Sequence, residues 1–212
     1  MTRTTVHLLR HGEVHNPTKV LYGRLPDFHL SDLGRQMADR AAEFFRDRDI
    51  AVVRSSPLER AIETATPVAK VHGLPIDVED RIIEAANVFE GQRVSVGDGV
   101  LRTPSAWKHL WNPLRPSWGE PYADLAARMS AAVADAREAA RGHEAVLVSH
   151  QLPVWIMRLC AEGRRYVHDP RHRQCSLASV TSLIYDGDHL TAISYAEPSR
   201  DLVPAAGPAR GA

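Results

Sequence analysis

Cysteine is scarce in this chain, because Cys160 and Cys175 are its only two among 212 residues. Two cysteines cannot build a disulfide framework, and their spacing does not form a CxxC redox motif. The chain also has no net charge, since 26 acidic residues balance 26 basic ones. No overall field therefore favours nucleic acid or an anionic membrane as a partner.

Long apolar runs are missing as well. No stretch approaches the length of a membrane span, and Met1 leads into a β-prone run without the apolar region of a signal peptide. We therefore expect a soluble, cytoplasmic protein that binds neither nucleic acid nor membranes.

Apolar residues still make up 44% of the chain, which is enough for one buried core at this length. Short β-prone runs alternate with segments of helical period, as in α/β proteins. Strands are expected at 6–9, 50–53, 75–78 and 145–148, helices at 31–45, 57–69, 123–141 and 152–160, and a hairpin at 180–195. We expect a three-layer α/β/α fold whose central sheet is mostly parallel, with helices on both faces.

The domain organisation is simple. We expect one domain over residues 1–197, with an irregular insertion at about 85–118 that lacks a clear period. This insertion could cover a substrate, or it could be a packed excursion anchored by its tryptophans. Residues 198–212 are rich in proline, alanine and glycine, which predicts a flexible tail.

The first strand ends in Arg10-His11-Gly12-Glu13. Ligands of open α/β sheets gather beyond the carboxyl ends of such strands. Gly12 has no Cβ to keep a ligand from the backbone, and Arg10 offers planar donors suited to a phosphate. His11 is then a nitrogen nucleophile beside an anion site.

The second strand ends in Ser55-Ser56-Pro57-Leu58-Glu59-Arg60. Ser56 is expected to cap the following helix, with Pro57 at its first position and Glu59 completing a capping box. Arg60 falls near the N-terminus of this helix, where the dipole favours an anion over a cation. It is therefore better placed as a phosphate ligand than as a solvated charge.

A second histidine, His150, follows the fourth predicted strand. Parallel strands end on the same edge of a sheet, so His11 and His150 can face one another. Each histidine alone would more often be a core or loop residue. Together with Arg10 and Arg60 they indicate a shared phosphoryl site.

Four motifs now stand in order: Leu-Arg-His-Gly-Glu at 9–13, Ser-Ser-Pro-Leu-x-Arg-Ala at 55–61, Arg-x-x-Glu at 81–84 and Val-Ser-His at 148–150. A lone RHG would be weak evidence, but this ordered set is specific. The chain resembles the histidine phosphatase, or phosphoglycerate mutase-like, superfamily over most of residues 5–195. Phe89-Glu90-Gly91 resembles its phosphatase-type branch.

The resemblance implies a role for each matching residue. His11 would be phosphorylated during turnover, Arg10, Arg60 and His150 would hold the phosphoryl oxygens, and Glu84 would protonate the leaving group. Phosphoryl transfer depends mainly on positioning and charge, which two guanidiniums and an imidazolium can supply. We therefore expect a phosphomonoesterase for a small phosphorylated metabolite, with no metal and no cofactor.

Further substrate or phosphate contacts are expected from Gly12, Asn16, Gly23 and Gln151. Two of them depart from the family pattern. The loop before Asn16 is one residue shorter than usual, and Gln151 stands where glycine commonly follows the second histidine.

Other interpretations stay open. A phosphoglycerate mutase-type phosphotransferase is the second enzyme hypothesis, although Ala85-Ala86-Asn87-Val88 replaces the residues typical of mutases after the glutamate. A catalytically weak phosphate-ester binding domain is the non-enzyme hypothesis. The basic segment 164–175 could meet an anionic part of a substrate or be a solvated loop, and its arginines disfavour a zinc site.

Overall fold

The computed structural model describes residues 2–92, 119–169 and 172–205. In this part of the chain six strands and four α-helices follow one another, with two 3₁₀ turns. The strands are β1 (Arg3–Arg10), β2 (Ile50–Ser55), β3 (Asp77–Val78), β4 (Glu144–Ser149), β5 (Val180–Asp186) and β6 (His189–Ala196). The helices are α1 (Asp32–Phe45), α2 (Glu59–His72), α4 (Tyr122–Ala139) and α5 (Gln151–Ala161), and the 3₁₀ turns are η1 (Asp80–Ile82) and η4 (Val203–Ala205).

The six strands form one sheet in the order β3-β2-β4-β1-β5-β6. The first four are mutually parallel, whereas β5 runs antiparallel to β1 and pairs with β6 as a hairpin. The predicted α/β fold is therefore confirmed, with a mixed sheet that is parallel where the predicted catalytic motifs lie. The predicted hairpin is also confirmed.

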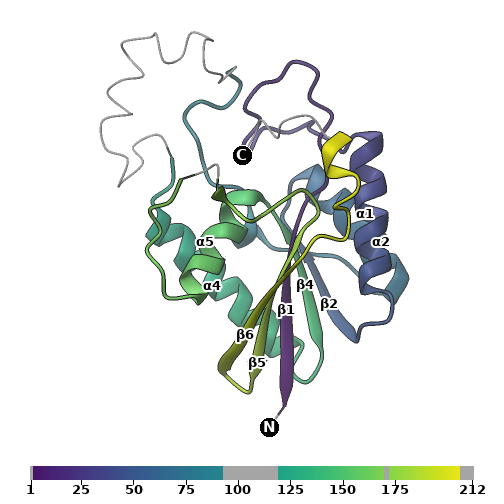
Figure 1. The fold of residues 1–212 in the computed structure, drawn as a ribbon, viewed down its shortest axis with the longest axis vertical. Coiled ribbons are helices and arrows are strands. Elements are labelled where there is room, and N and C mark those ends of the chain that lie inside the picture. Colours follow the sequence, from purple (N-terminus) through teal and green to yellow (C-terminus); the bar gives the residue numbers. More distant parts are fainter. Residues whose placement is uncertain (1, 93–118, 170–171, 206–212) are drawn as a thin grey trace.

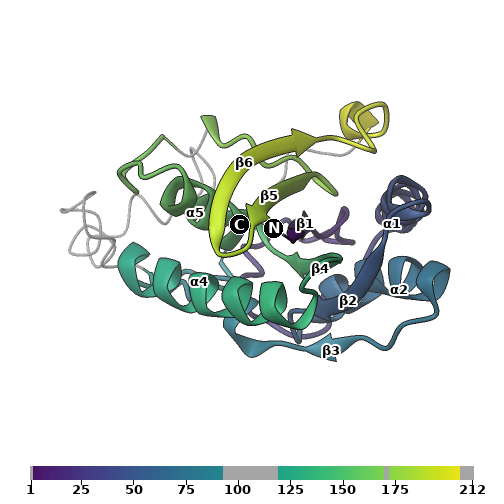
Figure 2. The same cartoon turned by 90° about the horizontal axis from the view of Figure 1, so that it is seen from below.

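The helices cover both faces of this sheet (Figures 1 and 2), with α1 and α2 on one face and α4 and α5 on the other. Alternate residues of β1 explain this arrangement, because neighbouring side chains of a strand point to opposite faces. Leu8 packs in the core cluster that contains Leu125 and Ile156, while Leu9 packs in the cluster that contains Phe45 and Val68. The sheet is thus buried on both sides.

The start of α1 is as predicted, since the Ser31 hydroxyl accepts a hydrogen bond from the Gly34 amide at 2.9 Å. The capping prediction for α2 is wrong. This helix begins at Glu59, its N-cap is Leu58, and no side chain caps it. The Ser56 hydroxyl instead lies 2.7 Å from His150 Nε2, so the tertiary structure has given it a different partner.

Part of the predicted flexible tail, residues 198–205, packs against the domain in the structure. Ser199 is buried and donates its hydroxyl to the Met37 carbonyl at 3.3 Å, and Leu202 and Val203 pack against Met37 and Leu177. These apolar contacts dock the segment on α1. The remainder of the tail, residues 206–212, and most of the predicted insertion, residues 93–118, lie outside the described residues.

Among the described helices, none combines the length and apolar character required to cross a bilayer.

Candidate active site

The register between β1 and β4 brings the two predicted histidines together. Arg10 pairs with Ser149 across these parallel strands, and the His11 amide donates to the Ser149 carbonyl at 3.0 Å. The next residue of each strand is therefore a histidine at the same edge of the sheet. The ring centroids of His11 and His150 lie 5.1 Å apart, and both side chains are fully buried.

The His11 ring presents one defined nitrogen. Its Nδ1 lies 2.7 Å from the Gly12 carbonyl oxygen, which can only accept, so Nδ1 carries the proton. The Nε2 atom is buried and has no hydrogen-bond partner among the described residues. Burial, followed by the charges of Arg60 and Arg10, holds the pKa of His11 well below its usual value. Nε2 is therefore an unprotonated nitrogen whose lone pair is available inside the protein.

Arg10 and Arg60 bring two positive charges to this nucleophile. Arg10 Nη1 donates to the Cys175 carbonyl at 2.6 Å, while Arg60 Nη2 donates to the Gly23 carbonyl. Arg10 Nε, Arg60 Nε and Arg60 Nη1 are buried without a partner in the described part of the chain. Buried donors are usually hydrogen-bonded, so this cluster of donors is suited to an anion.

His150 is the neighbouring donor. Its Nε2 is paired with the Ser56 hydroxyl, whereas its Nδ1 is buried and has no partner within the described ranges. Burial, and then the charges of Arg60, His11 and Arg10, place the pKa of His150 well below its usual value. These surroundings favour the neutral ring, so the predicted imidazolium would require a neighbouring negative charge.

Glu84 lies two residues beyond η1 and is 3% exposed, so its carboxyl group is effectively out of water. One carboxyl oxygen accepts the Ala85 amide at 2.8 Å. Burial raises the pKa of Glu84, although the Ala85 hydrogen bond and the charges of Arg60, Arg173 and Arg10 oppose this rise. A carboxyl group whose pKa is raised keeps its proton to higher pH, which is the property that a general acid needs.

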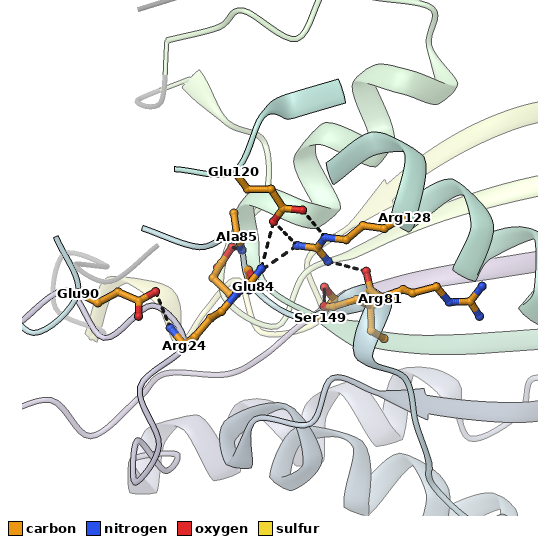
Figure 3. A network of polar contacts seen from close by, with 9 residues as sticks. Arg24, Arg81, Glu84, Ala85, Glu90, Glu120, Arg128 and Ser149 are labelled. Atoms are coloured by element: carbon orange, nitrogen blue, oxygen red, sulfur yellow. Dashed lines mark hydrogen bonds and ion pairs between the residues drawn. The ribbon is translucent and has the colours of Figure 1, made fainter. Parts of the chain in front are cut away.

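A network of polar contacts fixes the backbone at Glu84 (Figure 3). Its carbonyl accepts Arg24 Nε at 2.7 Å and Arg128 Nη2 at 3.4 Å. The carboxylate of Glu120 binds both guanidiniums, with Nη2 of Arg24 at 3.1 Å and Nε of Arg128 at 2.7 Å. This network holds in place the short segment that carries the acid.

The other residues predicted to contact the substrate differ in what they touch in the structure. A Cβ on Gly12 would lie 2.5 Å from the Gly34 carbonyl oxygen, so the glycine allows close packing between the RHG loop and α1. Gly23 has a positive φ of 42° and supplies the carbonyl that orients Arg60. The amide of Asn16 is used within its own loop, where it binds Val20. Gln151 instead donates to the Cys175 carbonyl at 3.4 Å.

Sequence reasoning missed several residues that support the cluster. The ring centroids of Tyr22 and His11 lie 6.5 Å apart. The guanidinium carbon of Arg60 lies 4.7 Å from the centroid of the Tyr22 ring. Thr64 donates to the Arg60 carbonyl at 2.7 Å and accepts the Gly12 amide at 3.2 Å. In the sequence only Gly23, an expected contact next to Tyr22, pointed to this loop.

No group of three or more histidine, cysteine, aspartate or glutamate side chains in the described ranges is arranged to hold a metal ion. The cluster of His11, His150, Arg10, Arg60 and Glu84, which we call the catalytic cluster, joins an unpaired histidine nitrogen, cationic donors without a partner in the described chain and a carboxyl group with a raised pKa. Such a set can transfer a phosphoryl group.

The model of the histidine phosphatase superfamily (branch 1) matches residues 6–198. Rv0525, an uncharacterized protein of Mycobacterium tuberculosis, is 58% identical over 196 residues, which cover 92% of this chain and 97% of that protein. The probable phosphoglycerate mutase GpmB of Photorhabdus laumondii is 30% identical over 186 residues, covering 82% and 83%. The native structure of mycobacterial glucosyl-3-phosphoglycerate phosphatase Rv2419c is similar with a TM-score of 0.71 at 26% identity, covering 92% of this chain and 96% of that one.

Proposed function

Because the chain belongs to the histidine phosphatase superfamily (branch 1), we propose that it is a phosphomonoesterase acting through a phosphohistidine on His11. The observation that carries the proposal is the unpaired His11 Nε2, buried beside guanidinium donors that have no partner in the described residues. Similarity to a protein named as a phosphatase supports hydrolysis. The substrate is a small phosphorylated metabolite.

In the first half-reaction, His11 Nε2 attacks phosphorus and the bond from phosphorus to the ester oxygen breaks. Glu84, held protonated by burial, gives its proton to the leaving oxygen. Arg10 and Arg60 hold the non-bridging oxygens, so that phosphorus and the leaving ester oxygen lie in line with Nε2. The products are a free alcohol and a phosphorylated His11.

In the second half-reaction, water attacks the phosphohistidine and the ionised Glu84 takes a proton from it. The bond from nitrogen to phosphorus breaks, and inorganic phosphate leaves. Glu84 regains its proton, so the cycle closes without a metal ion or cofactor. Positive charge from Arg10 and Arg60 performs the stabilisation that a metal would otherwise supply.

His150 acts as a donor to the same oxygens. The Ser56 hydroxyl lies 2.7 Å from Nε2 and fixes the ring, while Nδ1 has no partner in the described chain. In the tautomer that carries its proton on Nδ1, this nitrogen donates to a phosphoryl oxygen and Nε2 accepts the Ser56 hydroxyl. A phosphate dianion raises the pKa of this ring when it binds, because it brings the opposite charge. Ser56 is therefore a positioning residue.

Mutase activity is the second candidate, favoured by the similarity to a protein named probable phosphoglycerate mutase. A mutase must keep its phosphorylated intermediate from water, whereas a phosphatase must admit water. Rapid interconversion of 2- and 3-phosphoglycerate with negligible release of phosphate would replace the phosphatase assignment with this one.

The decisive experiment is rapid acid-free quenching of turnover with a ³²P-labelled ester, followed by peptide mapping. We expect an alkali-stable, acid-labile label on His11, and no label on the His11→Ala protein. The same preparations are assayed with 4-nitrophenyl phosphate for steady-state release of phosphate. Label on His150, or a full burst from His11→Ala, would contradict the assignment of the nucleophile.

A further inference from the structure

Arg173, in the segment between α5 and β5, is not needed by the mechanism above. It is half-buried, and no carboxylate of the described residues lies within ion-pair distance of it. Among the buried and half-buried arginines of the described residues, only Arg10 and Arg60 likewise have no ion pair. Every other such arginine has one: Arg24, Arg48, Arg54, Arg81, Arg128, Arg137 and Arg158.

Neutral groups hold the Arg173 guanidinium. Its Nε donates to His168 Nε2 at 2.8 Å, and its Nη1 donates to the Gln151 side-chain oxygen at 3.2 Å. His168 Nδ1 donates to the Tyr166 carbonyl at 2.6 Å, so the second ring nitrogen is free to accept. Burial is the main cause that lowers the pKa of His168, which keeps this ring uncharged. The charge of Arg173 is thus positioned without being neutralised.

The Arg173 side chain is joined to the catalytic cluster by two short links. Gln151, its partner, follows His150 directly and donates its own amide to the Cys175 carbonyl at 3.4 Å. The same carbonyl accepts Arg10 Nη1 at 2.6 Å. One amide side chain and one backbone carbonyl therefore connect the guanidiniums of Arg173 and Arg10.

Arg173 also acts on Glu84. Burial raises the pKa of Glu84, and among the opposing charges Arg173 comes after Arg60 and before Arg10. Burial lowers the pKa of Arg173, and the two groups that most oppose this are Tyr122 and Glu84. Because a general acid must reach the leaving oxygen, a cation beside Glu84 is on the leaving-group side of the phosphorus.

We propose that Arg173 binds a carboxylate on the alcohol part of the substrate, so that the preferred substrates are phosphomonoesters of hydroxy acids. This inference rests on the proposed function and specifies its substrate class. Arg10 and Arg60 balance a phosphate dianion, and Arg173 supplies one further positive charge for one further anion. Three of its five N–H groups have no partner in the described chain, and their planar arrangement suits a carboxylate.

The test compares 3-phosphoglycerate with glycerol 3-phosphate. Both have alkyl leaving groups, but only the first carries a carboxylate on the alcohol. We expect the unmodified protein to prefer 3-phosphoglycerate by about 10- to 100-fold in kcat/KM, the range of a charge-assisted hydrogen bond. Arg173→Gln should remove this preference mainly through KM, and Arg173→Lys should restore part of it. The readout is the ratio of kcat/KM for the two alkyl esters, because any change at Glu84 affects both esters alike.

Arg165→Gln is the matched control, because Arg165 is an exposed arginine of the same inter-element segment. It should leave the preference unchanged. Binding of both esters to the His11→Ala protein, with and without Arg173→Gln, gives a second readout that does not require turnover.

The outcomes separate the two proposals. Equal use of both esters, an equal loss on every substrate in Arg173→Gln, or a preference for a second phosphate over the carboxylate would overturn the role of Arg173 while leaving the phosphatase intact. Absence of turnover with all esters, including 4-nitrophenyl phosphate, would defeat the proposed function instead. In that case the binding experiment still decides the role of Arg173. If Arg173→Gln abolishes the difference between the dissociation constants of 3-phosphoglycerate and glycerol 3-phosphate, the carboxylate site is supported; if the difference is unchanged, the site is contradicted.

Discussion

His7 on β1 and His11, the residue directly after this strand, are four residues apart but have opposite surroundings. His7 and His11 are both fully buried. His7 has a partner for each ring nitrogen, with Ser182 Oγ 2.7 Å from Nδ1 and Glu144 Oε2 2.8 Å from Nε2. His11 Nε2 has none among the described residues. A buried histidine whose hydrogen bonds are complete holds a structure together, whereas one with a free nitrogen is prepared for a ligand.

The contrast extends to their surroundings. Each region contains a histidine, a serine and a glutamate, so residue types alone do not distinguish them. Around His7 the glutamate is ionised, since the hydrogen bond from His7 is the main cause that lowers its pKa. Near His11 the pKa of Glu84 is shifted the other way, since burial raises it. We therefore expect the His7 region to stabilise the fold and the catalytic cluster to bind a substrate.

Replacing the two histidines is the strongest way to break this comparison. His11→Ala should lower turnover by about 10⁴-fold or more, because it removes the nucleophile. His7→Gln should keep turnover within about threefold but cost about 1–3 kcal/mol of unfolding free energy, because Ser182 or Glu144 loses its partner. Steady-state assays and urea unfolding measure the two effects. A catalytic defect in His7→Gln beyond its loss of folded protein would contradict the division.

The two glutamates should separate next. Glu84→Gln should lower kcat by about 10²-fold or more with an alkyl ester, but by less than about tenfold with 4-nitrophenyl phosphate, whose leaving group needs little protonation. Glu144→Gln should leave both rates nearly unchanged. A loss with Glu84→Gln that is independent of the leaving group would exclude its role as an acid.

Their effects on stability should have opposite signs at neutral pH. The folded pKa of Glu84 is raised, so stability is lost as the pH rises from the unfolded pKa through the folded one. Glu84→Gln removes this loss and should therefore stabilise the protein at neutral pH. The folded pKa of Glu144 is lowered, so its stabilisation is present above the unfolded pKa and disappears as pH falls through the folded one. Glu144→Gln should therefore lower Tm at neutral pH and have little effect in acid. Thermal unfolding across pH tests both signs.

The two serines sharpen the comparison further. Ser56→Ala should slow turnover by about 3- to 10-fold, because His150 loses the hydroxyl that orients it. Ser182→Ala should leave the rate unchanged and lower stability by about 1–3 kcal/mol, because a buried ring nitrogen of His7 is left unpaired. The reverse pattern would show that Ser56 is structural.

The smallest expected effect is that of metal removal. Exhaustive dialysis against EDTA should leave turnover of 4-nitrophenyl phosphate unchanged, because Arg10 and Arg60 provide the positive charge. Vanadate should instead inhibit competitively, since it can occupy the same donors. Loss of activity in EDTA that a divalent ion restores would contradict this account.

The sequence alone predicted the fold class, the family and the members of the catalytic cluster. These depend on local signals: β-prone runs, helical period, and charged or imidazole side chains that directly follow strands. The parallel register of β1 and β4 then needs only the rule that such strands end on one edge to bring His11 and His150 together. For the same reason Ser31 was predicted correctly as the N-cap of its helix, since a cap and the amide it binds are three residues apart.

Tertiary structure decided whatever depends on partners distant in the chain. Ser56 has the local pattern of a cap, but it is bound to a histidine 94 residues away. The network that holds Glu84 joins Arg24, Glu120 and Arg128, and the docking of Ser199 uses a carbonyl 162 residues away. The pKa shifts of His150 and Glu84 could not be predicted from the local sequence either. A pKa depends on how fully the fold removes a group from water and on which charges the fold places nearby.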